Sequence, residues 1–227
     1  MFEERDNLEL LHRELSAALA EVKGGVELIY VDDGSRDGSA EVLLDLAKRD
    51  ERVRVLRFAE NSGQSAAFAA GFQAARGEIV ATLDADLQND PADLPRLLAA
   101  LHHADVVNGV RLGRRDGLVR RLSSRIGNGF RNWVTRESVT DVGCSLRVMR
   151  ASYLRRVKLY RGMHRFLPTL LRLEGARVTE LPVSHRPRRH GRSKYGIGNR
   201  LFVGLADVFA VRWMQKRQLR WRLRDRE

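Results

Sequence analysis

Apolar residues recur at two different spacings along the first 110 residues, and the two spacings alternate. Leucines at positions 8, 11, 15 and 19 follow the helical repeat and predict a helix over 6–19, whereas the short apolar run 27–31 predicts a strand. Strands that alternate with helices in this way indicate βαβ units, an α/β class and a mostly parallel sheet with helices on both faces. The same criteria predict helices over 39–48 and 63–75, a helix that begins at residue 90, and strands over 52–58, 78–83 and 105–110.

The pattern becomes more basic after residue 111. It predicts helices over 118–134 and 163–173, a strand over 141–147 and an edge strand over 177–185, followed by a glycine-containing basic segment. The longest apolar stretch, 201–211, is interrupted by Asp207 and is much shorter than the roughly 20 residues that a membrane-spanning helix needs. We therefore expect no transmembrane helix, and the acidic, polar N-terminus does not resemble a signal peptide.

Charge divides the 227 residues into two unlike parts. Residues 1–100 contain 11 Lys/Arg and 20 Asp/Glu, a net of −9, whereas residues 101–227 contain 30 and 9, a net of +21. This asymmetry predicts a polyanionic partner, namely a phosphorylated substrate, an anionic membrane or a nucleic acid. The chain has no recognisable nucleic-acid-binding module, which argues against nucleic acid. Its single cysteine, Cys144, excludes an intramolecular disulfide.

Two carboxylates follow the strand predicted over 78–83. Asp84 and Asp86 point to the same side if the strand geometry persists, and like charges held this close repel unless a positive charge lies between them. Ligands of a parallel sheet bind beyond the carboxyl ends of its strands, where Asp32, Asp33 and Arg111 also fall. We therefore expect one crevice in which Mg²⁺ or Mn²⁺ joins the carboxylates to a diphosphate, with Gln88 as a further oxygen ligand.

Four short motifs occur in order along the chain: Val31-Asp-Asp-Gly-Ser-Arg-Asp-Gly-Ser39, Asn61-Ser-Gly-Gln64, Leu83-Asp-Ala-Asp-Leu-Gln88 and His190-Gly-Arg-Ser-Lys-Tyr195. Together they closely resemble the family 2 glycosyltransferases, and in particular the group of dolichol-phosphate mannosyltransferases and polyprenyl-phosphate glycosyltransferases. The resemblance implies a GT-A fold and an inverting, metal-dependent transfer of mannose or a similar sugar from a nucleotide-sugar to a polyprenyl or dolichyl phosphate. The alternatives are transfer to a saccharide hydroxyl within the same family and, remotely, a basic nucleic-acid-binding protein.

The resemblance also implies roles for individual residues. Asp33, with Asp32 beside it, and Glu4 are expected to contact the donor nucleoside. A phosphate acceptor is already mostly charged at neutral pH, because its second pKa is near 6, so Asp141 is expected near the reaction centre as an orienting group rather than an obligatory base. The metal and diphosphate are assigned to Asp84, Asp86 and Gln88, and the donor and acceptor phosphates to Arg111, Arg125, Arg189, Ser193 and Lys194.

The sequence departs from the family pattern at its start. Related proteins open with an apolar strand before a turn, and residues 1–7 match only that turn and the beginning of the first helix. We therefore expect a GT-A catalytic domain over 1–195 that lacks its first strand. A misassigned start codon is the preferred explanation for this difference.

The C-terminal segment combines basic and aromatic residues. Residues 212–227 contain seven Lys/Arg, two acidic residues, Trp213 and Trp221, a composition that suits an interfacial helix on anionic lipid. We expect residues 196–227 to be a membrane-docking segment, and the protein to be cytoplasmic and peripheral on the cytoplasmic face of the membrane. The alternative is an amphipathic helix that packs on its own domain.

Overall fold

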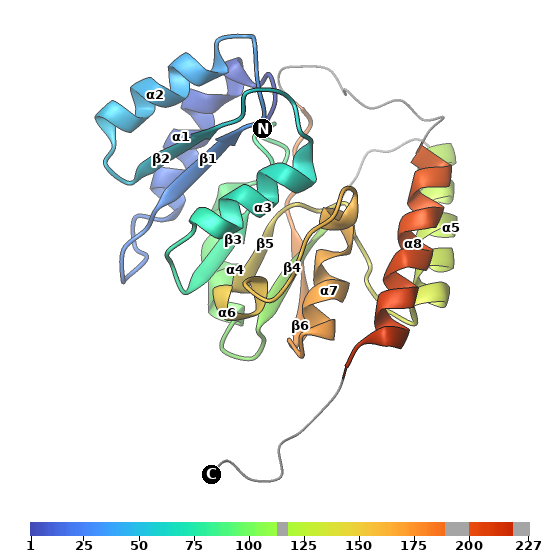
Figure 1. Ribbon diagram of the computed structural model, residues 1–227. Coiled ribbons are helices and arrows are strands. Elements are labelled where there is room, and N and C mark those ends of the chain that lie inside the picture. Colours follow the sequence, from blue (N-terminus) through green and yellow to red (C-terminus); the bar gives the residue numbers. More distant parts are fainter. Residues whose placement is uncertain (113–117, 189–199, 220–227) are drawn as a thin grey trace.

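A computed structural model describes residues 1–112, 118–188 and 200–219, with the side chains of 118–125 and 200–203 excepted (Figure 1). The predicted alternation of strands and helices is confirmed in the first half of the chain. The elements, in chain order, are α1 (Arg5–Ala18), β1 (Leu28–Asp32), α2 (Ser39–Arg49), β2 (Val53–Arg57), α3 (Gln64–Ala74), β3 (Ile79–Thr82), the 3₁₀ turn η1 (Pro91–Asp93), α4 (Leu94–Ala100), β4 (Val106–Arg111), α5 (Leu118–Thr135), β5 (Arg147–Arg150), α6 (Ala151–Leu154), the 3₁₀ turn η2 (Met163–Phe166), α7 (Leu167–Leu173), β6 (Val178–Val183) and α8 (Arg200–Arg217).

The strands form two hydrogen-bonded groups. Strands β1 and β2 pair in parallel, and a second sheet has the order β3-β5-β4-β6. In this second sheet β4 and β6 are parallel, whereas β5 is antiparallel to both of its neighbours, so β3, β4 and β6 share one direction and β5 is reversed. The α/β class with a largely parallel sheet is confirmed, and the reversed β5 is the exception to parallel pairing among the described strands.

Helices cover both faces of the second sheet. Val106 and Met149 face each other across β4 and β5, and the next pair, Val107 and Val148, points to the opposite face. The first pair packs with α6 and α7, and the second pair packs with α1, α2 and α4, in two separate apolar clusters. The alternating apolar residues of β4 and β5 therefore stabilise a helical layer on each side.

The segment predicted as a strand over 141–147 is mostly a turn and a loop, and only Arg147 belongs to β5. The reason is that side chains occupy the hydrogen-bonding groups of this backbone. The Thr82 hydroxyl donates to the Ser145 carbonyl at 2.7 Å, and the Arg147 guanidinium donates to the Val142 carbonyl at 3.0 Å. These carbonyls have their partners without a neighbouring strand.

Met1 lies on the edge of β1 opposite β2. Its amino group donates to the Val31 carbonyl at 2.7 Å, and its carbonyl accepts from the Asp33 amide at 2.8 Å. This is the bonding pattern of a parallel ladder. Among the described residues, no strand precedes α1, and β1 and β3 belong to separate hydrogen-bonded groups.

Helices α5 and α8 lie side by side at one end of the molecule (Figure 1). Val208 and Val211 of α8 are buried in a third apolar cluster with Phe166 and Leu170. These contacts pack α8 on the domain. The helix continues beyond the apolar stretch 201–211 and therefore also carries Trp213. Within the described residues no helix has the length and apolar character needed to span a bilayer.

Candidate active site

The turn after β3 carries the two carboxylates predicted to bind metal. The Asp84 amide donates to the Ser145 hydroxyl at 3.0 Å, and the Gln64 side chain donates to Asp84 Oδ1 at 2.9 Å. Asp86 Oδ1 accepts from the Gln88 amide at 3.1 Å. Leu87, which lies between Asp86 and Gln88 in the sequence, is fully buried. Its φ of +60° is an outlier for a bulky side chain. Such backbone strain is typical of functional turns.

The charges at this turn favour a cation. Burial raises the pKa of Asp84, and the nearby charge of Asp86 raises it further, so the two carboxylates destabilise each other in the ionised state. The described residues contain no group of three or more His, Cys, Asp or Glu side chains placed to hold a metal. Two carboxylates suffice for Mg²⁺ or Mn²⁺ when substrate phosphates supply further oxygens. The site fits such a cation as one shared with a bound diphosphate.

Asp32 and Asp33 organise the loops at the end of β1. Asp32 Oδ1 accepts from the Ser35 amide at 3.1 Å. The Asp33 carboxylate accepts from the Ser62 and Gly63 amides at 2.7 and 3.1 Å, and from the Asn61 side chain at 3.1 Å. This loop leads into α3, whose first residue contacts Asp84. The second and third motifs are therefore physically joined to the first.

Gly34 permits the close approach of the loop after β1 to the backbone at Glu60 and Asn61. Its φ is +74°, and a Cβ added there would lie 2.6 Å from the Glu60 carbonyl carbon. Both the backbone conformation and the space therefore exclude a side chain.

Glu4 lies nearby, with its amide donating to the Ser39 hydroxyl at 3.2 Å and its carboxylate accepting from Asn7 at 2.6 Å. The predicted nucleoside-binding acids thus surround the carboxyl end of β1.

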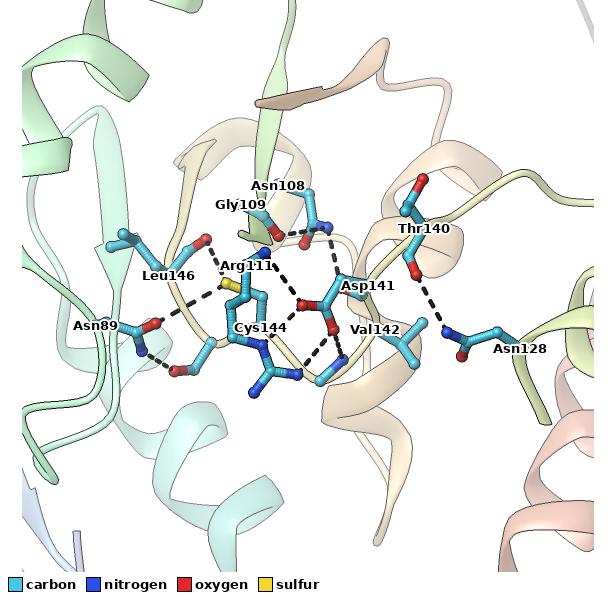
Figure 2. Close-up of polar contacts among 12 residues, drawn as sticks. Asn89, Asn108, Gly109, Arg111, Asn128, Thr140, Asp141, Val142, Cys144 and Leu146 are labelled. Atoms are coloured by element: carbon cyan, nitrogen blue, oxygen red, sulfur yellow. Dashed lines mark hydrogen bonds and ion pairs between the residues drawn. The ribbon is translucent and has the colours of Figure 1, made fainter. Parts of the chain in front are cut away.

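Arg111, the last residue of β4, forms an ion pair with Asp141 that Figure 2 shows at the centre of the view. The guanidinium donates from Nε to Oδ2 at 2.7 Å and from its terminal nitrogen to Oδ1 at 2.8 Å. Asp141 also accepts from the Gly143 amide at 3.1 Å. Burial lowers the pKa of Arg111, but Asp141 and, more weakly, Cys144 and Asp84 raise it, and the net shift is upward. The Ser145 hydroxyl, which accepts from the Asp84 amide, belongs to the same loop as Asp141, so the acidic turn and this ion pair are connected through that loop.

A buried arginine that the motifs did not identify supports this loop. Arg147 donates to Asn108 Oδ1 at 2.8 Å and to the His164 carbonyl at 3.2 Å. It is 2% exposed, and burial lowers its pKa. Asn108 in turn donates to the Asp141 carbonyl at 3.3 Å (Figure 2). The sequence signal that could have revealed this network is Asn108, a polar residue within the apolar run 105–110.

The structure brings most of the predicted residues to the carboxyl ends of β1, β3 and β4. Arg125 lies on α5, but its side chain is not among those described. Arg189, Ser193 and Lys194 lie outside the described residues. Their assignment to the phosphates stays a prediction.

Comparison with known proteins identifies the family. The chain matches the profile described as Glycosyl transferase family 2 over residues 2–158, and it belongs to this family. It is 40% identical over 199 residues to the undecaprenyl-phosphate 4-deoxy-4-formamido-L-arabinose transferase of Edwardsiella ictaluri, covering 87% of this chain and 61% of the relative. It is 36% identical over 226 residues to the dodecaprenyl-phosphate galacturonate synthase of Rhizobium johnstonii, covering 97% of this chain and 67% of the relative. The expected resemblance to polyprenyl-phosphate glycosyltransferases is confirmed, and the chain spans about two thirds or less of these relatives.

Solved structures confirm the GT-A fold. The glucosyl-3-phosphoglycerate synthase of Mycobacterium tuberculosis, in complex with Mn²⁺ and UDP-glucose, has a TM-score of 0.67 and 18% identity, covering 95% of this chain and 76% of that one. The mannosyl-3-phosphoglycerate synthase of Rubrobacter xylanophilus has a TM-score of 0.69 and 16% identity, covering 99% and 75%. At these identities the likeness establishes the fold alone.

Proposed function

We propose that this chain carries the catalytic domain of an enzyme that transfers a sugar from a nucleotide-sugar to the phosphate of a polyprenyl lipid, with Mg²⁺ or Mn²⁺ and with inversion. The observation that carries the proposal is the acidic turn of Asp84 and Asp86 beside the Arg111–Asp141 ion pair, in a family whose curated relatives are named for undecaprenyl and dodecaprenyl phosphate. The turn suits a metal-bound leaving diphosphate, and the arginine suits a phosphate.

The donor is assigned to the acidic half of the site. Asp84 and Asp86, with Gln88, would hold the cation, which would neutralise the leaving diphosphate. Asp32, Asp33 and Glu4 would surround the nucleoside. In this structure Asp33 binds the loop at Asn61, so its contribution to nucleoside binding includes positioning that loop.

The acceptor is assigned to the basic half. A phosphate monoester needs little help from a general base, so catalysis rests mainly on positioning and on charge stabilisation. Asp141 suits an orienting role, since both of its oxygens already accept hydrogen bonds from Arg111 and can hold that guanidinium in place. Transfer to a saccharide hydroxyl would need Asp141 as a base, and its engagement with Arg111 disfavours that alternative.

A small cavity whose lining includes Val142, the residue after Asp141, supports an anionic, partly apolar acceptor. It has a volume of about 190 Å³ and lies between α5, α8 and the loop that contains Val142. Phe130, Phe166 and Val208 contribute apolar walls, and Arg131 and Arg165 contribute charge. Arg131 is 5% exposed, and its NH1 group has no hydrogen-bond partner among the described residues. The charge of this buried arginine at the wall of the cavity suits an anionic ligand.

Exposed aromatic residues support docking on an anionic membrane. We define the aromatic patch as the exposed Ile126 and Trp133 of α5 and Phe209 and Trp213 of α8, together with the half-buried Phe130 of α5. Trp133 is 75% and Trp213 64% exposed, and the Phe130 and Phe209 rings meet edge to face at 6.3 Å. Exposed Trp and Phe beside Arg212, Lys216 and Arg217 suit an interfacial surface. We propose that this patch, with residues 196–227, places the protein peripherally on the cytoplasmic face.

The deciding experiment measures transfer of radiolabelled sugar from a panel of GDP- and UDP-sugars into an organic-extractable lipid. Polyprenyl phosphate, a polyprenyl alcohol and a water-soluble saccharide are offered as acceptors, with and without chelator. We expect label only with the lipid phosphate and free divalent cation. Label in the saccharide would favour the alternative acceptor, and full transfer in excess chelator would refute the metal.

A further inference from the structure

The segment that follows β6 forms hydrogen bonds with the end of the acidic turn, which we define as residues 84–89. His185 forms an antiparallel bridge with Asn89, and the Arg186 amide donates to the Gln88 carbonyl at 2.9 Å. The Arg186 guanidinium pairs with Glu14 and Asp90, at 2.7 and 2.6 Å. These contacts fix the backbone up to residue 186 and bring the next arginine to the proposed metal ligands.

Arg188 occupies one oxygen of the proposed metal site. Its terminal nitrogen donates to Asp86 Oδ2 at 2.6 Å, and its other terminal nitrogen lies 3.7 Å from Glu4 Oε1. The Asp86 side chain is 10% exposed, and its other oxygen accepts from the Gln88 amide. Both carboxylate oxygens are therefore engaged, and the oxygen that faces away from the turn is covered by a guanidinium.

A divalent cation and this guanidinium compete for the same oxygen. Two positive groups a few ångströms apart repel, and the repulsion is doubled when one of them carries two charges. A guanidinium released from Asp86 needs another anion, and its planar fork matches phosphate oxygens. A nucleoside diphosphate that arrives with the cation supplies such oxygens at the same place.

We propose that Arg188 is an exchangeable counter-ion: it neutralises Asp86 in the absence of ligand, is displaced from Asp86 by the divalent cation, and then binds the diphosphate of the donor. The inference rests on the proposed function, because it takes Asp86 as a metal ligand. It makes binding of the cation without donor weak and binding of cation and donor together strong. An empty site is thereby protected from capturing a cation that no donor accompanies.

The first test measures Mn²⁺ affinity by electron paramagnetic resonance, with no nucleotide present. Arg188→Gln is expected to bind Mn²⁺ about tenfold more tightly than the unmodified protein, because a charge-assisted competitor is lost. Arg188→Lys, which keeps the charge, should stay within roughly threefold of the unmodified protein, as an order-of-magnitude expectation. Arg186→Gln is the matched control, since it removes an arginine of the same segment whose partners are Glu14 and Asp90.

The second test measures binding of UDP and GDP at saturating Mn²⁺ by calorimetry. Arg188→Gln is expected to bind whichever nucleotide the unmodified protein prefers about tenfold more weakly, the opposite direction from its effect on the metal. Unchanged or weaker Mn²⁺ binding in Arg188→Gln overturns the proposal, as does unchanged nucleotide binding. Asp86→Asn separates this from failure of the proposed function: if that variant binds Mn²⁺ as the unmodified protein does, the metal assignment itself is wrong.

Discussion

Arg111 and Asp141 are joined by two parallel hydrogen bonds, from Nε to Oδ2 at 2.7 Å and from the terminal nitrogen to Oδ1 at 2.8 Å. Gly143 allows this geometry, because a Cβ there would lie 2.6 Å from the same terminal nitrogen of Arg111. The pair joins the end of β4 to the loop before β5. It therefore fixes the Arg111 guanidinium in place and engages both oxygens of Asp141, the carboxylate that we expected near the reaction centre.

Asp141→Asn tests whether this carboxylate orients or accepts a proton. We expect kcat/KM to fall by about 10²-fold, because the arginine loses its two-point partner. The acidic limb of the pH–rate profile should stay where it is, since no essential base has been removed. Steady-state transfer to polyprenyl phosphate between pH 5 and 9 measures both. Loss of the acidic limb in the variant would instead identify Asp141 as the base.

Asp86→Ala tests the metal site by activity. Transfer is expected to fall by roughly 10³-fold or more, because a metal contributes several kcal/mol of charge stabilisation to the leaving diphosphate. The unfolding transition should be retained, since Asp86 lies in a turn and belongs to none of the apolar clusters. Asp45→Ala, an exposed carboxylate of α2 that pairs with Arg49, is the control. Comparable activity in both variants would exclude Asp86 as a ligand.

His164 is expected to make the fold sensitive to acid. Burial, together with the charges of Arg165 and Arg147, lowers its pKa from 6.5 to about 4. Between these values the unfolded chain binds more protons than the folded one, so stability falls as the pH falls. From pH 7 to pH 5 this residue should cost about 2 kcal/mol of unfolding free energy.

Chemical denaturation at the two pH values measures this loss. The His164→Gln variant should lose about 2 kcal/mol less than the unmodified protein over this interval. His103→Gln, which alters an exposed histidine, provides the comparison and should keep the full pH dependence. An identical pH dependence in the His164 variant would show that this histidine is not the sensitive group.

The aromatic patch is expected to anchor the protein to lipid. Replacing Trp133 and Trp213 together by Gln should reduce partition into anionic vesicles by at least about tenfold, since each large apolar side chain contributes roughly 1.5–3 kcal/mol when buried. Remaining binding should be weakened by salt, because it is electrostatic. Vesicle flotation measures both. Leu44→Gln with Tyr160→Gln alters exposed apolar residues elsewhere and should leave flotation unchanged; equal loss in both double variants would argue against the patch.

The sequence by itself determined the elements whose signal is local. The leucine repeat of α1 and the apolar runs of β1 and β4 depend on residues a few positions apart, so periodicity predicted them. The acidic residues at strand ends were also readable, because a parallel sheet collects those ends at one edge. The α/β class and the grouping of Asp33, Asp84 and Arg111 followed from these local signals, whereas the family followed from the resemblance of the four short motifs.

Tertiary structure alone decided what depends on neighbours far away in sequence. Residues 141–146 became a loop because Thr82, on β3, takes a carbonyl that a strand would have used. Strand β5 lies between β3 and β4 and is antiparallel to both, and no local pattern specifies either its position or its direction. Arg188 meets Asp86 across 102 residues only because β6 ends beside the acidic turn. Local periodicity records which face of an element is buried, whereas strand order and long-range ion pairs depend on how those faces are assembled.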